Sequence, residues 1–338
     1  MRKLLFVLFL LVLLGGCGKK NQIELLGAGA TFPQPFYEKM FVEYEKESGI
    51  KVGYHSIGSG GGIFRLKNKL ADFGATDIIV NNGDFTDKIV HIPICLGAVA
   101  ITYNLPTNPQ INFTPEVLAA IFSREITNWN NKKITDLNPD IVLPNQRILV
   151  INRSDESGTT NIFNNYLCKV SDKWKEHKEN PLKKIFELSA SSNSEMAELI
   201  KETFGAIGYA SLSYVQKNNM PCGKIMNLSG NFIAPELKSV SNATTSDIPD
   251  DTEIYITNTK AENGYPISSF SWLIVYKNLG YLKKEKAKKL IKLVDWMIHE
   301  GQKFSSSLYY APLSLETVQK AEVLLKSVTW NNEKKIRR

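Results

Sequence analysis

Cysteine and histidine are scarce in this chain of 338 residues, and their spacing argues against several kinds of metal site. Only four of each occur, no two cysteines form a C-x-x-C pair, and no histidine belongs to an H-E-x-x-H group. Because zinc sites need such spacings, we expect no metal ion. Cys95 lies inside an apolar run and is predicted to be a small buried side chain. The sequence leaves open whether Cys168 and Cys222 form a disulfide.

The glycine signatures of nucleotide-binding proteins and serine hydrolases are missing as well. Gly27 and Gly29 are followed by Phe32, where the dinucleotide fingerprint needs another glycine. No Walker lysine follows a glycine-rich loop, and no G-x-S-x-G elbow occurs. We therefore expect no cofactor and no serine-hydrolase activity.

The formal net charge is +7, but the distribution of the basic residues does not favour nucleic acid as a partner. They cluster at 283–289 and at 334–338. We interpret the first cluster as the solvated face of a helix whose apolar side carries Leu290, Leu293, Val294 and Met297. Aromatic and basic residues are not interleaved as they are in single-strand-binding proteins, so no nucleic-acid partner is expected.

The N-terminus contains a hydrophobic run, Leu4–Leu14, directly after two basic residues. A helix that spans a membrane needs roughly 20 apolar residues, so this shorter run predicts an export signal over residues 1–16. The residues that end at Cys17 resemble the bacterial lipobox, which makes Cys17 the expected lipidation site and 17–23 a lipidated tether. The alternative is a plain secretory signal with an incidental cysteine.

Apolar strand-like runs alternate with helical patterns through the rest of the chain, which predicts an α/β fold. The long apolar segment Ile89–Tyr103 is expected to be broken at Pro93. A helix should begin at Pro115 with Thr114 as its cap, and two more are expected near 283–300 and 314–327. About 320 residues follow the signal, more than one hydrophobic core usually holds, so we expect two domains.

Three loops combine glycine with small hydroxyl residues where a strand is expected to meet a helix. They are Gly27–Phe32, Gly58–Gly62 and Arg153–Thr160, the last of which follows the apolar run Ile148–Ile151. A helix N-terminus offers free N–H groups and the positive end of the helix dipole, and the third loop adds a guanidinium. Together the loops predict a site for a tetrahedral oxyanion in preference to three ordinary helix caps.

A carboxylate in the segment Asp72–Asp77 refines this prediction. Asp77 is expected just after a short buried strand, close to the glycine loops. Because an ionised carboxylate only accepts hydrogen bonds, it suits an anion that still carries a proton. Phosphate near neutral pH carries such a proton and sulfate does not, which favours phosphate. The alternative interpretation is that Asp77 caps a helix.

These motifs together resemble the phosphate-binding protein of the bacterial phosphate ABC importer, the PstS family. Further matching segments make the likeness cover nearly the whole exported chain: Ile126–Trp129, Gly205–Tyr209, Tyr265–Ser268 and Asp295–Trp296. The resemblance implies that Asp155 orients the arginine and that phosphate contacts lie at Thr31, Phe32, Ser59, Asp77, Arg153, Ser157, Gly158 and Thr159. The chain departs from the family pattern at Gly60, Thr76 and Glu156. Glu156 is expected to point to solvent.

The resemblance also implies a two-lobed periplasmic-binding-protein fold of the class II type, with the ligand cleft between two α/β domains. Lobe I would comprise 24–97 and 264–338, and lobe II 98–263. Two chain crossings, near Leu96–Thr102 and Asn258–Ile267, would form the hinge. The implied protein is a monomer, not an enzyme, that binds inorganic phosphate with high affinity. It would hand phosphate to the permease and ATPase subunits of an ABC importer, held on the cell membrane by its lipid anchor and facing the periplasm or the cell exterior.

Three other functions stay open at this stage. A binding protein for sulfate, molybdate or tungstate would share the oxyanion loops but would have no use for Asp77. A phosphatase with Ser157 or Thr159 as nucleophile would need a base, and none of the four histidines stands in a suggestive place. A phosphate sensor that serves no transporter would have the same site.

Overall fold

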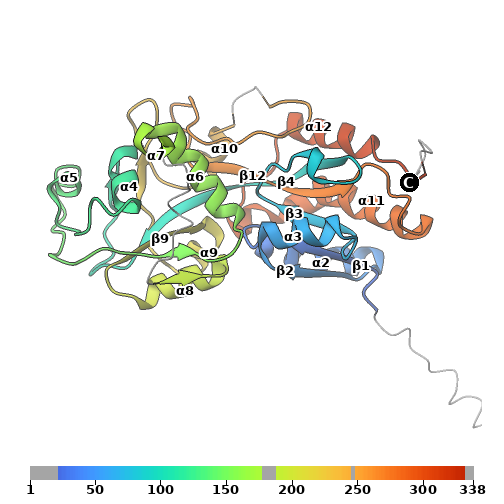
Figure 1. Ribbon diagram of the computed structural model, residues 1–338, viewed down its shortest axis with the longest axis horizontal. Coiled ribbons are helices and arrows are strands. Elements are labelled where there is room, and N and C mark those ends of the chain that lie inside the picture. The colour runs from blue at the N-terminus through green and yellow to red at the C-terminus, as the bar shows by residue number, and fades with distance from the viewer. Residues whose placement is uncertain (1–21, 177–187, 245–247, 332–338) are drawn as a thin grey trace, which may run out of the picture.

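The computed structural model describes residues 22–176, 188–244 and 248–331. They form two α/β lobes placed side by side along the long axis of the molecule (Figure 1). The expected signal peptide 1–16, the lipidation site Cys17 and nearly all of the tether 17–23 lie outside the described residues. The mixed α/β architecture predicted from the sequence is confirmed.

A seven-stranded sheet runs through both lobes in the order β2-β1-β3-β12-β4-β9-β6. Its strands are β1 (Leu25–Gly29), β2 (Val52–Ser56), β3 (Phe73–Thr76), β4 (Ile89–Tyr103), β6 (Leu149–Val150), β9 (Ala206–Ser211) and β12 (Ser268–Tyr276). β1 pairs in parallel with β2 and β3, whereas β12 runs antiparallel to β3 and β4. The carboxyl ends of β1, β2 and β3 therefore meet at one edge of the sheet, where α/β proteins place their ligands.

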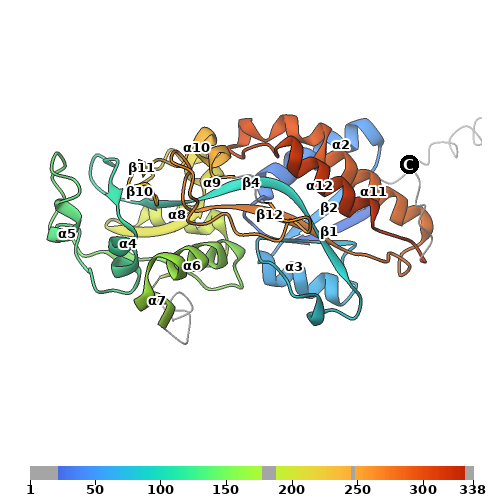
Figure 2. The ribbon, with the colours of Figure 1, turned by 90° about the horizontal axis from the view of Figure 1, so that it is seen from above.

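Helices cover both faces of the lobe I part of this sheet. α3 (Gly58–Lys67) lies on one face, and α2 (Gln34–Ser48), α11 (Lys284–Ile298) and α12 (Leu315–Lys326) lie on the other (Figure 2). Two short 3-10 helices, η3 (Glu300–Phe304) and η4 (Ser306–Leu308), follow α11. The two predicted C-terminal helices are confirmed. The predicted apolar face of α11 is fully buried at Leu290, Leu293, Val294 and Met297, and each such side chain contributes about 1.5–3 kcal/mol of burial free energy.

Lobe II is built from shorter elements around β9 and the end of β4. Its helices are α4 (Pro115–Phe122), α5 (Lys132–Thr135), α6 (Gly158–Val170), α7 (Asp172–Glu176), α8 (Asn193–Glu202), α9 (Leu212–Lys217) and α10 (Leu237–Asn242). β5 (Asn112–Phe113), β10 (Lys224–Met226) and β11 (Phe232–Ile233) form one small sheet, and β7 (Asn152–Arg153) pairs with β8 (Ser189–Ala190). Thr114 caps α4 as predicted, because its hydroxyl accepts the Val117 N–H at 3.3 Å.

β4 belongs to both lobes. It pairs with β12 as far as Ala98 and with β9 from Val99 onward, and it arches from one lobe into the other (Figure 2). The predicted break at Pro93 is wrong, because β4 continues through it. The pairing shifts from Cys95 opposite Ser271 to Pro93 opposite Trp272, so Ile94 forms a bulge in β4 next to the proline, which has no N–H to donate. From the change of pairing partner along β4 we propose the lobe boundaries 24–97 with 264–338, and 98–263.

The described cysteines serve as packing groups. Cys95, Cys168 and Cys222 are all free thiols, so Cys168 and Cys222 are not joined. Cys95 is fully buried in β4, as predicted. Burial raises the pKa of the Cys222 thiol to about 12. A thiol that stays protonated at neutral pH is a weak nucleophile, so nothing here indicates cysteine chemistry.

Candidate anion-binding site

The three parallel strands of lobe I bring three of the predicted residues to one edge of the sheet. Thr31 follows β1, Ser59 follows β2 and Asp77 follows β3, and all three side chains are buried. The sequence predicts a free loop at Gly58–Gly62, which is wrong in detail, since α3 already begins at Gly58. Ser59 therefore lies in the first turn of α3, among backbone N–H groups that have no partner within the helix. Phe32 is also fully buried.

The arginine loop of lobe II faces this edge. The predicted strand Ile148–Ile151 is replaced by the shorter β6 and by β7, at whose end Arg153 lies. Arg153 Nε and Nη2 each donate to the Asp155 carboxylate at 2.7 Å, which fixes the plane of the guanidinium. The Arg153 side chain is 1% exposed, and its Nη1 has no hydrogen-bond partner among the described residues. A buried donor left in this way is costly, which favours an external acceptor at this position.

The residues after the arginine form the start of α6. Ser157 is its N-cap, and the Ser157 hydroxyl accepts the Thr160 N–H at 3.1 Å. Gly158 and Thr159 occupy the first turn, where the backbone N–H groups point out of the helix and the helix dipole is positive. This end of α6 is therefore suited to an anion.

Protein donors already occupy the hydroxyl oxygens of the site. Asn193 Nδ2 donates to Thr31 Oγ1 at 2.9 Å and to Thr159 Oγ1 at 3.0 Å, and the Ser157 hydroxyl accepts the helix N–H described above. Among the described residues, no acceptor takes the hydroxyl proton of Thr31, Ser157 or Thr159. These three O–H groups therefore remain as donors for a group that lies between the lobes.

Asp77 is the acidic group among these donors. The Ser271 hydroxyl of β12 donates to Asp77 Oδ1 at 2.6 Å. Burial raises the pKa of Asp77 to about 7, although the Ser271 hydrogen bond, the charge of Arg153 and the Ser59 hydroxyl act to lower it. The alternative that Asp77 caps a helix is wrong, because the next helical turn is η1 (Asn82–Asp84).

The two lobes touch at this site, so the cleft is closed. A Cβ added to Gly158 would lie 2.3 Å from Ser59 Oγ and 2.6 Å from Asp77 Oδ2. Gly60 N–H donates to the Glu156 carbonyl at 3.0 Å, and the Glu156 side chain lies over Gly60. Glu156 is exposed to solvent, as expected. A side chain at position 158 would hold the lobes apart, which explains the need for glycine there.

Sequence reasoning missed two buried residues of the site. Asn193 is the first residue of α8, and Ser271 anchors Asp77. The N-cap Ser192, followed three residues later by glutamate, marks the helix start in the sequence. Nothing local indicates that Asn193 meets Thr31, which lies 162 residues away in the chain.

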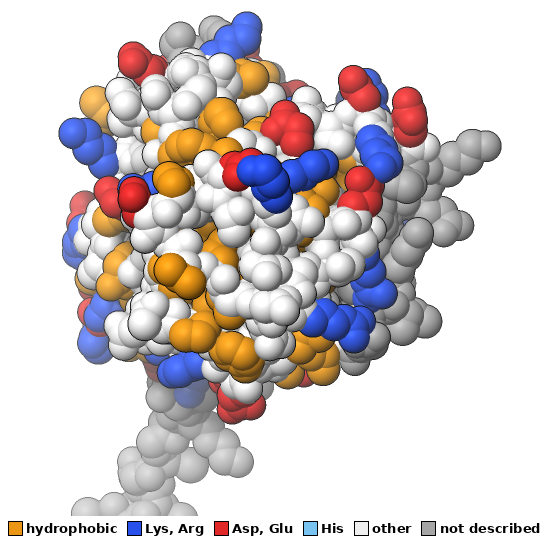
Figure 3. Space-filling view, turned by 90° about the vertical axis from the view of Figure 1, so that its left-hand side faces the viewer, with side chains coloured by type: hydrophobic (Ala, Val, Ile, Leu, Met, Phe, Trp, Pro, Cys, Tyr) orange, Lys and Arg blue, Asp and Glu red, His pale blue; other side chains and the backbone are white. Residues whose placement is uncertain are grey.

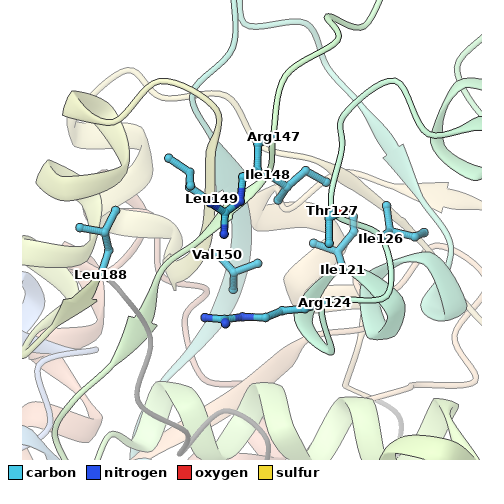
Figure 4. A pocket seen from close by; sticks show the side chains of 9 residues that line it. All are labelled: Ile121, Arg124, Ile126, Thr127, Arg147, Ile148, Leu149, Val150 and Leu188. Atoms are coloured by element: carbon cyan, nitrogen blue, oxygen red, sulfur yellow. The ribbon is translucent and has the colours of Figure 1, made fainter.

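A separate small pocket lies in lobe II (Figure 4). Its volume is about 50 Å³, and it is lined by Ile121, Arg124, Ile126, Thr127, Arg147, Ile148, Leu149, Val150 and Leu188. Both of its arginines are exposed to solvent, unlike the buried Arg153. None of the predicted site residues lines it, so we assign no role to this pocket.

Comparisons with known proteins agree with this geometry. A family model described as PBP superfamily domain matches residues 18–300. The phosphate-binding protein PstS of Pasteurella multocida is 32% identical over 311 residues, which cover 90% of this chain and 90% of that protein. Its counterpart in Haemophilus influenzae is 33% identical over 303 residues, which cover 87% and 90%. A solved structure from Clostridium perfringens, a putative phosphate ABC transporter substrate-binding protein with bound phosphate, has a TM-score of 0.63 at 17% identity and covers 86% of this chain and 99% of that chain.

The two-lobed α/β fold, with a closed cleft between the lobes, is that of a substrate-binding protein of the PBP superfamily. The identity to PstS proteins extends over nearly the whole chain, and the chain belongs to the PstS family. The resemblance that the motifs indicated is thereby confirmed.

Proposed function

We propose that this protein binds inorganic phosphate between its lobes and delivers it to the permease and ATPase subunits of a phosphate ABC importer. The observation that carries the proposal is a cluster of buried donors around one carboxylate: Arg153 Nη1, three free hydroxyl protons and the first turns of α3 and α6. The names of the PstS relatives and the phosphate in the Clostridium perfringens structure support the same ligand.

The proposed contacts are those expected from the sequence: Thr31, Phe32, Ser59, Asp77, Arg153, Ser157, Gly158 and Thr159. Asp155 holds the guanidinium in place through the two hydrogen bonds described above. A hydrogen bond to a charged group contributes about 1.5–3 kcal/mol, so a few such bonds suffice for tight binding. Closure of the lobes removes water from these bonds and strengthens them.

Asp77 is the group proposed to distinguish phosphate from sulfate. Ser271 holds Asp77 Oδ1, which leaves Oδ2, beside Gly158, to face the ligand. An ionised Asp77 accepts a hydrogen bond from the P–O–H group of phosphate, whereas fully ionised sulfate would meet it with like charge. The pKa of Asp77 is about 7, so above this pH the discrimination should be strongest. Hydrogen bonds of this kind reject the wrong analogue by roughly 10⁴-fold.

Binding without catalysis is part of the proposal. Ser157 and Thr159, which a phosphatase would need as nucleophiles, accept hydrogen bonds from Thr160 N–H and Asn193. Neither hydroxyl meets a base among the described residues, and His91 accepts the Val80 N–H elsewhere in lobe I. A nucleophilic hydroxyl needs an adjacent base, so this arrangement favours a binding role.

We propose an exported, monomeric protein that is anchored by a lipid at Cys17 and faces the periplasm or the cell exterior. The lipobox at the N-terminus supports the anchor. In the described part of the chain, no helix has the length and apolar character needed to cross a membrane. The end face of lobe II mixes acidic, basic and hydrophobic side chains (Figure 3), which does not favour a nucleic-acid partner.

Calorimetry of the full chain near pH 8 tests the ligand. We expect tight phosphate binding that a large excess of sulfate does not change. Asp77→Asn should weaken phosphate binding and let sulfate compete, because the amide no longer repels sulfate. Asp84→Asn, at an exposed carboxylate of the same lobe, should change neither. Sulfate binding as tight as phosphate binding, or no phosphate binding at all, would contradict the proposal.

A further inference from the structure

We propose that Asn193 is a positioning residue that directs the hydroxyl protons of Thr31 and Thr159 toward the ligand. This inference rests on the proposed function, since it concerns donors for phosphate. Asn193 is fully buried, and it lies where α8 of lobe II meets the end of β1 in lobe I. One amide thus contacts both sides of the cleft.

A backbone contact fixes which way the Asn193 amide points. The Ser211 N–H lies 2.8 Å from Asn193 Oδ1. Because a backbone N–H only donates, the atom that faces it must be the amide oxygen. The amide nitrogen Nδ2 then faces Thr31 and Thr159. The reverse orientation would bring two donors together and is therefore excluded.

Both protons of the amide nitrogen are used within the protein. Nδ2 lies 2.9 Å from Thr31 Oγ1 and 3.0 Å from Thr159 Oγ1. The backbone N–H of Asn193 also points at Thr31 Oγ1, at 3.3 Å. No donor of the side chain is left for phosphate, so Asn193 acts through the two hydroxyls.

The consequence for the hydroxyls follows from their bonding capacity. A hydroxyl has one proton to donate and two lone pairs that accept. The amide occupies lone pairs of Thr31 and Thr159, so each proton turns toward the cleft. Without the amide, the Thr159 hydroxyl has no donor to hold it and can present lone pairs to the anion, and Thr31 Oγ1 keeps only the longer contacts from the Asn193 backbone N–H at 3.3 Å and Arg153 Nη2 at 3.5 Å. Asn193 therefore holds both hydroxyls as donors before the ligand arrives, which lowers the entropic cost of binding.

A double-mutant cycle on the full chain, with inorganic phosphate as the probe in calorimetry, tests this role. Asn193→Ala should raise the phosphate Kd by about 30-fold or more, because two bonds to a charged ligand are weakened. In a Thr31→Val, Thr159→Val background the same substitution should change Kd by less than about 2-fold, since no hydroxyl is left to direct. An equal factor in both backgrounds would show that Asn193 only supports the fold, and would overturn the proposal.

Two further variants keep the result interpretable. Asn138→Ala removes another buried amide of lobe II, whose Oδ1 accepts the Asn112 N–H at 2.8 Å, and should lower stability while leaving Kd unchanged. If Asn193→Ala does not fold, Asn193→Ser replaces it in the cycle. A lack of phosphate binding by the unmodified chain would refute the proposed function, whereas binding with an additive cycle would refute this inference alone.

Discussion

At the scale of single residues, the site depends on buried groups whose bonding capacity is not used within the chain. Arg153 Nη1 has no partner among the described residues, and Asp77 is buried at the centre of the cleft. Both are unfavourable in a closed cleft without an anion, because Nη1 has no partner and the Asp77 carboxyl, although Ser271 donates to it, is desolvated by burial. A protonated oxyanion satisfies both at once. Ligand binding is thereby coupled to closure at these two residues.

The raised pKa of Asp77 predicts how the stability of the ligand-free protein depends on pH. The folded, closed state binds the Asp77 proton more tightly than the unfolded chain, whose carboxyl has a pKa near 3.8. The contribution of Asp77 to the stability of the folded protein is therefore fully present below about pH 4, and it is lost as the pH rises toward about 7. Asp77→Asn removes this loss. As pH rises, the free energy of unfolding of the variant should therefore increase relative to that of the unmodified chain, by on the order of 4 kcal/mol at most.

Urea unfolding in phosphate-free buffers at about pH 4.5, 6 and 8 measures this difference. Opening of the cleft rehydrates Asp77, so the observed gain should lie below the upper bound. Asp84→Asn, at an exposed carboxylate, should show a difference that does not vary with pH. If the advantage of Asp77→Asn is the same at all three values, the carboxyl is not desolvated as described.

At the scale of elements, residues 248–259 form a segment that we call the strap. The strap contacts both lobes on its way back to β12. Thr252 Oγ1 donates to a carbonyl of β4 at 3.0 Å. The Tyr255 hydroxyl accepts the Ile79 N–H of lobe I at 3.0 Å and donates to Asn161 Oδ1 of α6 at 2.6 Å. Ile79 lies two residues after Asp77, and α6 begins at the site, so Tyr255 joins the two halves of the site.

Loss of the Tyr255 hydroxyl should loosen the closed state. Tyr255→Phe removes both hydrogen bonds, and we expect phosphate to bind about 10-fold more weakly, through faster release. Stopped-flow fluorescence and calorimetry would measure the release rate and Kd. The matched control is Tyr281→Phe, whose hydroxyl bonds to the Asp72 carbonyl within lobe I and whose loss should leave Kd unchanged. An unchanged release rate in Tyr255→Phe would show that the strap does not stabilise the closed arrangement of the lobes.

At the scale of the whole molecule, one sheet continues through both lobes, and β4 is the element that they share. Two compact lobes joined in this way move most easily by bending near the point where β4 changes partner. The proposed lipid at Cys17 precedes β1 of lobe I. Lobe I would thus be the tethered half, and lobe II the half that moves over the phosphate.

The proposed anchor predicts where the protein is found in the cell. Cys17→Ser should shift it from the membrane fraction to the soluble exported fraction, because the acylation site is lost. Fractionation followed by immunoblotting measures this shift. Cys168→Ser, which changes a free and half-buried thiol of the folded part, should remain with the membrane. Release of neither variant would mean that Cys17 carries no lipid.

Local patterns in the sequence were sufficient for much of the fold. The helix cap at Thr114, the apolar face of α11 and the buried Cys95 were predicted because each depends on neighbours within a few residues. Pro93 was misjudged, since β4 continues past it through a bulge at Ile94, and its pairing partner β12 lies far along the chain. The start of α3 at Gly58 was misjudged because glycine has a low helix propensity, which tertiary contacts override here.

The sequence by itself determined the chemistry of the site: an arginine, small hydroxyls, glycines at helix starts and one carboxylate, in motifs specific enough to identify the family. Only the tertiary structure decided how these groups are bonded. It paired Asp77 with Ser271 and Thr31 with Asn193, and left Arg153 Nη1 without a partner. Such pairings join residues more than a hundred positions apart, and they follow from strand order and lobe closure, which no local pattern encodes.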